Sequence, residues 1–165
     1  NKRLPAVNFA AYVDNPKSYG VCEFNDDGTP KQLIEKPTQF LSNWAITGLY
    51  FYDERAPQIA KTLKPSKRGE YEITDVNTAY LNSNTLTVRK LQRGITWMDA
   101  GNHTSLLEAS NFVNAIEQRQ GLKLGCPEEI AFRMKYIDRK NFCTLIDNCK
   151  NESYSQYLRK ILEQA

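Results

Sequence analysis

Apolar residues gather in short runs over the first half of the chain and recur at helical spacing over the second half. Short runs rich in apolar and aromatic side chains, bounded by turn-forming residues, predict β-strands. Such runs lie at residues 6–13, 20–24 and 44–52, and weaker patterns at 86–91 and 95–98. The first half of the chain is therefore predicted to form a sheet.

A tight turn is predicted directly after the 20–24 strand. Asn25-Asp26-Asp27-Gly28 consists of residues that favour reversals, so the chain should return along a strand that ends in Ile34-Glu35-Lys36-Pro37. Gly48 interrupts the apolar run from Trp44 to Tyr52. A glycine inside a strand indicates a bulge or a close backbone approach.

Helical spacing predicts a helix at 54–63 and a second one that starts at Thr74, read as its N-cap, with Asp75 in the first turn. The clearest helix covers 105–120, with Asn102 or Thr104 as its cap and one apolar stripe formed by Leu106, Ala109, Phe112, Val113 and Ile116. Beyond Gly125 the pattern is helical to the end of the chain, including an apolar face at 153–164. Strands with embedded helices, followed by helices, predict an α/β or α+β fold with a helical C-terminal cap.

The length of 165 residues fits a single domain, with a sheet-rich part at 1–104 and a helical part at 105–165. The net charge is only +3 and the charges are interleaved, so the sequence offers no continuous basic stripe for nucleic acid. It contains no apolar run of roughly 20 residues and no signal-type segment. We therefore expect a cytoplasmic protein that binds neither nucleic acid nor membrane.

The cysteines and the histidine do not suggest a metal or nucleophile site. The four cysteines are irregularly spaced without a CxxC pair, which argues against zinc and favours reduced, partly buried thiols. His103 is the single histidine and has no serine or cysteine partner at a recognisable spacing. A capping or packing role fits His103 better than that of a general base.

Asp99 is the strongest candidate for chemistry. It follows the predicted strand at 95–98 and precedes Gly101, where a bare backbone allows a ligand to approach closely. Mg²⁺ typically uses only one or two protein carboxylates and completes its shell with water and phosphate oxygens. Asp99 could therefore hold Mg²⁺, or it could merely cap the next turn.

Three further segments carry polar groups suited to a phosphorylated sugar. Glu35 could accept hydrogen bonds from hydroxyl groups, and Lys36 and Arg68 could bind a phosphate. Tyr19 and Gly20 offer a hydroxyl group and an uncovered backbone. The alternatives stay open: a solvated Glu-Lys surface pair, a solvent-facing arginine, and a turn with a packed tyrosine.

Seven segments of the chain resemble the C-terminal half of the glucose-1-phosphate thymidylyltransferases, which are sugar nucleotidylyltransferases. They occur in the family's order and approximate spacing: YGVCEF, IEKP, SNWAITGLYFYD, RGEYEITDVNTAYL, RGITWMDAGNHTSLLEASNFV, RQGLK and CPEEIAFR. The resemblance as a whole runs from about Ala6 through the helical tail and so extends over nearly the whole chain. The resemblance implies the C-terminal part of a Rossmann-like mixed sheet. It also implies Mg²⁺-dependent transfer of dTMP from dTTP to glucose 1-phosphate, which yields dTDP-glucose and pyrophosphate.

The resemblance also implies roles for individual residues. Asp99 matches the second of two metal-binding aspartates. The residues that match the sugar-phosphate pocket are Tyr19, Gly20, Glu35, Lys36, Ile46, Arg68 and Trp97. The residues that resemble a regulatory nucleotide-sugar site near a subunit contact are Arg93, Gly94, Glu129, Ile130 and Arg133. The family is usually a homotetramer, so a homo-oligomer is expected.

Two departures limit what the resemblance implies. The family reads WLDTGTH where this chain has WMDAGNH, so Ala100 and Asn102 replace two threonines. Residues 1–165 also contain no GGxGTRLxPxT segment, the family's triphosphate-binding loop. The isolated chain is therefore expected to need a separate N-terminal half for turnover, and a catalytically silent sugar-phosphate-binding or assembly module is the competing interpretation.

Overall fold

The computed structural model describes residues 5–164. Contacts divide the chain into two compact units, with the division between Trp97 and Met98. The first unit holds the sheet and the second is helical, so the fold is α/β with a mixed sheet, as predicted. No helix among the described residues is long and apolar enough to cross a membrane.

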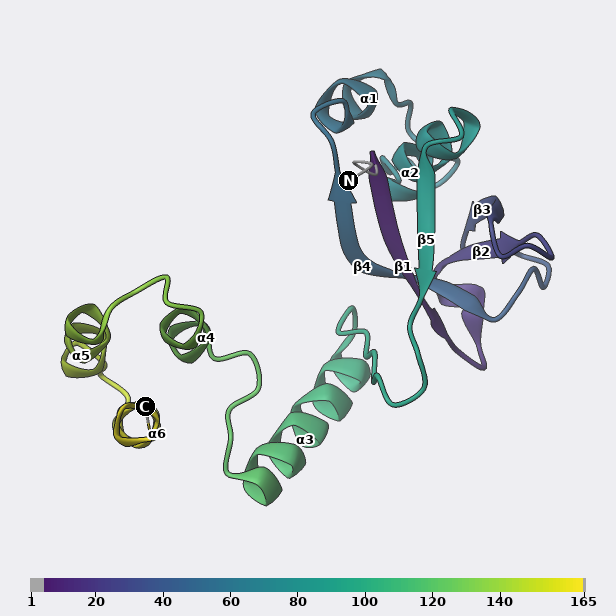
Figure 1. The fold of residues 1–165 in the computed structure, drawn as a ribbon. Coiled ribbons are helices and arrows are strands. Elements are labelled where there is room, and N and C mark those ends of the chain that lie inside the picture. Colours follow the sequence, from purple (N-terminus) through teal and green to yellow (C-terminus); the bar gives the residue numbers. More distant parts are fainter. Residues whose placement is uncertain (1–4, 165) are drawn as a thin grey trace. The chain divides into compact units, whose positions relative to one another are not determined.

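The first unit is built on one five-stranded sheet with the order β3-β2-β4-β1-β5 (Figure 1). Its strands are β1 (Ala6–Tyr12), β2 (Gly20–Phe24), β3 (Pro30–Glu35), β4 (Trp44–Tyr52) and β5 (Leu86–Lys90). β5 runs parallel to β1, whereas the other neighbouring strands are antiparallel. A short 3-10 turn, η1 (Pro16–Ser18), leads into β2, and the helices α1 (Ala56–Thr62) and α2 (Ile73–Asn82) lie between β4 and β5 in the chain.

The predicted hairpin and bulge are both present. The amide of Asn25 donates to the carbonyl of Thr29 across the turn, and Gly28 has the positive φ of 82° that a reversal of this kind favours. The pairing of β1 with β4 shifts so that Asn8 lies opposite Tyr50 but Ala10 lies opposite Ile46. Three residues of β4, with Gly48 in the middle, therefore face Phe9 alone.

One apolar core joins α2 to the sheet. Its buried members are Ala6, Ala10, Cys22, Leu33, Ile46, Val76, Tyr80, Leu86 and Val88. Tyr80 stacks on Tyr52 with ring centroids 5.5 Å apart, and the Tyr52 hydroxyl donates to Asn77 Oδ1 at 2.5 Å. Burial is the main reason why the pKa of Tyr80 rises to about 12, so this phenol stays neutral in the core.

Two sequence predictions about this region are wrong. Thr74 is not the N-cap of α2, because the helix starts at Ile73 with Glu72 at the cap position. Residues 95–98 do not form a strand. The chain turns at Gly94, where φ is 95°, and the amide of Ile95 donates back to the carbonyl of Gln92, so the segment leaves the extended path of β5.

The second unit contains α3 (His103–Gln120), α4 (Pro127–Arg133), α5 (Arg139–Asp147) and α6 (Glu152–Glu163). The Asn102 side chain caps α3 by accepting from the amide of Ser105, as one of the two predicted alternatives. The helices α4, α5 and α6 share a core that includes Cys126, Phe142, Ile146, Tyr157, Leu158 and Ile161. Phe132 stacks on Phe142 with ring centroids 4.4 Å apart.

Asn8 introduces an unusual polar group into the first core. It is fully buried between Ala6 and Ala10 on β1, and neither its amide nitrogen nor its amide oxygen has a hydrogen-bond partner among the described residues. Burial of an amide without compensation costs about 1–3 kcal/mol. Asn8 therefore weakens the sheet that carries the candidate site.

Replacement of Asn8 by valine should raise the free energy of unfolding by about 1 kcal/mol, because valine suits a buried strand and removes the uncompensated amide. Urea unfolding measures this change. Asn8→Asp serves as the opposite control and should destabilise the protein, since it buries a charge at the same position. A loss of stability in Asn8→Val would show that the amide is compensated after all.

Candidate functional site

The end of β3 places Glu35 and Lys36 beside Tyr19 and Gly20. Gly20 pairs with Glu35 in the antiparallel ladder between β2 and β3, and the amide of Lys36 donates to the carbonyl of Tyr19 at 3.0 Å. Lys36 has a φ of 41°, a left-handed conformation that non-glycine residues rarely adopt. Strain of this kind often accompanies functional positions, and here it ends the strand and turns Lys36 out of the ladder.

The start of α2 is joined to Glu35 by a short hydrogen bond. Thr74 Oγ1 donates to Glu35 Oε2 at 2.5 Å, and Thr74 itself is buried. Gly20 makes this contact possible: a Cβ atom at position 20 would lie 2.8 Å from Thr74 Oγ1 and 3.0 Å from Glu35 Oε2. The carboxylate of Glu35 is therefore fixed between two strands and a helix.

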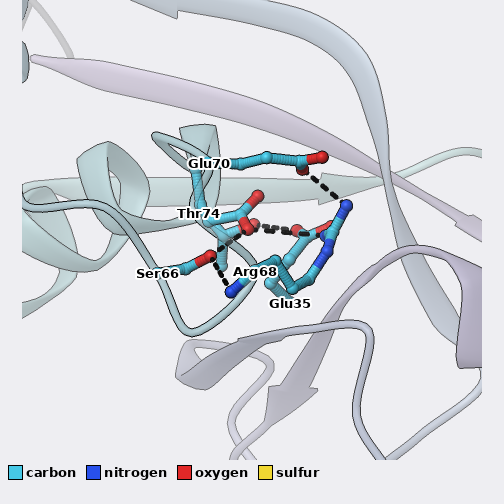
Figure 2. Close-up of polar contacts among 6 residues, drawn as sticks. Glu35, Ser66, Arg68, Glu70 and Thr74 are labelled. Atoms are coloured by element: carbon cyan, nitrogen blue, oxygen red, sulfur yellow. Dashed lines mark hydrogen bonds and ion pairs between the residues drawn. The ribbon is translucent and has the colours of Figure 1, made fainter.

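Arg68 lies in the connection before α2 and meets the same carboxylate. Its Nη1 atom is 3.8 Å from Glu35 Oε1 and 3.4 Å from Glu72 Oε1. Its Nη2 atom is 2.5 Å from Glu70 Oε2. Figure 2 shows Arg68 reaching toward Glu35 from this connection. Three carboxylates thus surround one guanidinium group.

The connection that carries Arg68 is held in shape by Ser66. The Ser66 hydroxyl donates to Glu72 Oε1 at 2.8 Å and accepts from the amide of Arg68 at 3.1 Å (Figure 2). The amide of Ser66 also donates to the carbonyl of Glu70 at 2.8 Å. The turn closes at Gly69, where φ is 77°, a value that glycine adopts at no steric cost.

The aromatic residues predicted for the pocket have different surroundings. Tyr19 and Trp97 meet edge to face, with ring centroids 5.1 Å apart, so Trp97 lies beside the β2 end of the cluster. Ile46 belongs to the buried core of β4. Tyr50 is not among the predicted site residues. Burial is the main cause that raises the pKa of its phenol, and the nearby charge of Glu35 is the second.

The structure thus brings Tyr19, Gly20, Glu35, Lys36 and Arg68 together in one cluster, with Trp97 against Tyr19. Sequence reasoning missed the groups that hold this cluster, which are Ser66, Glu70, Glu72 and Thr74. Three of them, Glu70, Glu72 and Thr74, belong to the RGEYEIT segment that contains Arg68, so that segment was the available sequence signal. The sequence pattern instead predicts that Thr74 is a helix cap. A fixed carboxylate with a guanidinium group beside it, followed directly in the chain by a lysine, can accept hydrogen bonds from hydroxyls and bind an anion.

Asp99 belongs to the second unit. Its carboxylate oxygens lie over Gly101, where a Cβ atom would come within 3.1 Å of Oδ2 and 3.3 Å of Oδ1, so glycine leaves room for this side chain. Residues 5–164 contain no group of three or more metal-ligating side chains. A single aspartate in the irregular segment before α3 fits the small share of ligands that a protein contributes to Mg²⁺.

The regulatory candidates fall into two groups. Arg93 and Gly94 form the turn after β5 in the first unit, and Arg93 lines a cavity of about 390 Å³ together with Tyr12, Trp44 and Trp97. Glu129, Ile130 and Arg133 lie on α4 in the second unit. The Arg133 Nε atom donates to Glu129 Oε1 at 2.7 Å, whereas Ile130 is exposed.

Two neighbouring acids on α4 are each bound by a tyrosine of α6. The Tyr154 hydroxyl donates to Glu128 Oε2 at 2.6 Å, and the Tyr157 hydroxyl donates to Glu129 Oε2. Cys126 Sγ lies 3.0 Å from the Tyr154 hydroxyl oxygen. The hydrogen bond from Tyr154 is the main reason why the pKa of Glu128 is lowered. These contacts tie α4 to α6.

A family model described as nucleotidyl transferase matches residues 2–116. The chain therefore belongs to the nucleotidyl transferase family. This membership agrees with the mixed sheet and with a cluster of carboxylates and cations at the end of β3.

Within that family, the chain is similar in sequence to proteins named glucose-1-phosphate thymidylyltransferase. It is 49% identical over 156 residues to the one of Mycolicibacterium smegmatis, which covers 94% of this chain and 54% of that protein. It is 47% identical over 167 residues to the one of Mycobacterium tuberculosis, with coverage of 99% and 58%. The chain thus spans a little over half the length of these curated relatives.

Two solved nucleotidyltransferase structures also align with this chain. A Bacillus anthracis structure described as a glucose-1-phosphate thymidylyltransferase in complex with sucrose aligns with a TM-score of 0.60 and 38% identity, over 68% of this chain and 44% of that chain. A UDP-glucose pyrophosphorylase complexed with UDP-glucose aligns with a TM-score of 0.58 and 24% identity, over 67% and 44%. The second likeness concerns the fold alone.

Replacement of Gly20 by alanine should lower the free energy of unfolding by about 1–3 kcal/mol, because the new methyl group collides with Thr74 Oγ1 and Glu35 Oε2. Thermal unfolding measures the loss. Gly48→Ala is the matched control, since nothing lies within 4 Å of a Cβ atom there. Thr74→Ala added to Gly20→Ala should recover part of the loss. Equal stability of the Gly20 and Gly48 variants would contradict the close approach.

Replacement of Tyr154 by phenylalanine should destabilise the second unit by about 1 kcal/mol at pH 7, because Glu128 loses its donor. The folded-state pKa of Glu128 lies below the ordinary 4.5, so the stabilisation is complete above about pH 4.5 and is lost as the pH falls through that lowered pKa. The difference from the unmodified chain should therefore narrow at pH 3. Urea unfolding at both pH values measures it, with the exposed Tyr136 changed to phenylalanine as control. A difference that stays constant with pH would argue against the carboxylate.

Proposed function

We propose that this chain supplies the sugar-phosphate half of a glucose-1-phosphate thymidylyltransferase. The single observation that carries the proposal is the Glu35, Lys36 and Arg68 cluster. It combines a fixed hydrogen-bond acceptor for sugar hydroxyls with two cations for a phosphate ester. The names of the relatives support the same substrate class.

In this reaction the protein mainly positions the substrates and neutralises their charge. The phosphate of glucose 1-phosphate attacks the α-phosphate of dTTP in line, forms the new P–O bond and releases pyrophosphate. The phosphate is already anionic, so no general base is required. Lys36 and Arg68 orient the nucleophilic phosphate, and Glu35 fixes the hexose by accepting from its hydroxyls.

We propose Asp99 as the residue through which this chain contributes to a Mg²⁺ site. The cation, when bound, neutralises phosphate charge in the reaction. The residues of this chain supply one carboxylate at that site and the two cations at the sugar phosphate. Arg93, Gly94, Glu129, Ile130 and Arg133 are retained as a proposed regulatory nucleotide-sugar site.

A cytoplasmic location and a homo-oligomeric state belong to the same proposal. Among the described residues, β5 pairs with β1 alone, so its outer edge presents backbone groups that can pair with additional polypeptide. That polypeptide is either a second copy or the separate N-terminal half that the resemblance leads us to expect.

The activity is tested in a chimaera in which this chain replaces the matching region of the Mycolicibacterium smegmatis relative. The chimaera should release pyrophosphate from dTTP and glucose 1-phosphate in the presence of Mg²⁺. The isolated chain should do so only after the N-terminal part of that relative is added. A chimaera that folds and binds dTTP but releases no pyrophosphate would favour a catalytically silent binding module.

Asp99→Asn in this chimaera should lower kcat by about 100-fold or more while KM for glucose 1-phosphate changes little, because the amide keeps the shape but loses the charge that a hard cation requires. Steady-state kinetics over a Mg²⁺ series measure both parameters. Asp75→Asn, on an exposed position of α2, is the control. Equal losses in kcat and in sugar-phosphate binding would contradict a role at the metal.

A further inference from the structure

The anion nearest to Arg68 is a side chain of the same connection. Glu70 Oε2 is 2.5 Å from Arg68 Nη2, the shortest of the three ion-pair distances to this arginine. Figure 2 shows this contact as a dashed line from Glu70 to Arg68, and it involves Nη2, whereas the nitrogen near Glu35 is Nη1. Arginine binds carboxylates and phosphates through the same planar N–H donors. Glu70 therefore occupies a position at which a phosphate oxygen could be held.

The three carboxylates around Arg68 differ in how firmly they are fixed. The Glu72 side chain is 11% exposed and that of Glu35 is 23% exposed, and besides the ion pair with Arg68 each accepts a hydrogen bond, from Ser66 and from Thr74 respectively. Glu70 is 59% exposed and its carboxylate contacts only Arg68 among the described residues. Of the three carboxylates, that of Glu70 can therefore move away from Arg68 with the smallest loss of interactions.

The backbone does not need to move for Glu70 to leave. The turn that carries both residues is closed by the hydrogen bond from the Ser66 amide to the Glu70 carbonyl at 2.8 Å and by that from the Gly69 amide to the Ser66 carbonyl at 2.9 Å. Ser66 also holds the Arg68 amide. A rotation of the Glu70 side chain into solvent is sufficient to free Nη2.

We propose that the Glu70 carboxylate competes with the sugar phosphate for Arg68, so that Glu70 lowers the affinity of the site for phosphate esters. This inference rests on the proposed function, because it assigns the phosphate to Arg68. An incoming phosphate replaces one carboxylate and leaves Glu35 and Glu72 to hold the guanidinium in place. Glu70 is thus an affinity-setting residue, and it takes no part in bond formation.

Glu70→Gln tests the competition because it keeps the size of the side chain and removes its charge. NMR titrations of the chain with inorganic phosphate, and separately with glucose 1-phosphate, measure Kd at constant ionic strength. The variant should bind both about 3- to 10-fold more tightly, since repulsion between two exposed charges at close range is modest. Glu54→Gln, an exposed acid before α1, is the matched control and should leave Kd unchanged because distant surface charges are screened.

Arg68→Gln separates this inference from the proposed function. If Arg68→Gln leaves phosphate binding unchanged, the assignment of the phosphate to Arg68 fails. If binding requires Arg68 but Glu70→Gln brings no gain in affinity, only the competition is overturned. If neither the unmodified chain nor Glu70→Gln binds phosphate, the competition and the assignment of the phosphate to Arg68 both fail. A gain that persists when Glu70→Gln is combined with Arg68→Gln also overturns it. A structural defect would weaken binding, so a gain in affinity that depends on Arg68 supports competition.

Discussion

The close approach of β2, the end of β3 and the start of α2 is the constraint on which the candidate site depends. Gly20 has no side chain, and the space it leaves is filled by the hydrogen-bonded pair of Thr74 and Glu35. Because β2 and β3 pair in register at Gly20 and Glu35, the same contact also sets the positions of Tyr19 and Lys36. This hydrogen bond thus holds the Glu35 carboxylate, the proposed acceptor for hydroxyl groups, next to the strained Lys36.

This contact is effective because α2 is itself held firmly on the sheet. Val76 and Tyr80 bury its inner face in the core, and the Tyr80 hydroxyl donates to Asp53 Oδ1 at 2.7 Å. The Tyr52 hydroxyl holds Asn77 in the middle of the helix. Since the Arg68 connection runs directly into the first turn of α2, the packing of tyrosines in the core limits where the guanidinium group can lie.

Much of the first unit follows from local sequence patterns. The short runs of apolar and aromatic residues, the Asn25 to Gly28 turn and the glycine inside β4 predict the strands, the hairpin and the bulge, because each feature depends on neighbouring residues. The segment at 95–98 was mispredicted because its apolar residues resemble a strand, whereas the positive φ of Gly94 redirects the chain. Thr74 was misassigned for a related reason: a threonine before an acid resembles a cap, and only the tertiary contact with Glu35 shows its actual role.

The site residues were predicted unevenly for physical reasons. Glu35, Lys36 and Arg68 can be proposed from the sequence because their side chains have the chemistry that a phosphorylated sugar requires, and that chemistry can be read from single residues. Ser66, Glu70 and Glu72 were missed because their importance lies in their distances to Arg68, which no sequence spacing reveals. Asp99 lies in an irregular segment of the second unit, with its carboxylate close to Gly101, whereas the sequence predicts it at the end of a strand that does not form.

The two cations of the cluster are controlled in different ways. Lys36 forms no ion pair within residues 5–164 and projects from a backbone held at a φ of 41°, so its position is determined by the end of β3. The position of the Arg68 guanidinium is determined by charge, since it lies near three carboxylates.

An arginine without partners would be mobile and fully hydrated, and an anion would have to order it on binding. Carboxylates that hold the guanidinium remove that entropic cost in advance, but each one also repels an incoming phosphate. A site that binds a dianion through such an arginine therefore needs one carboxylate that is weakly held, and the exposure of Glu70 provides it.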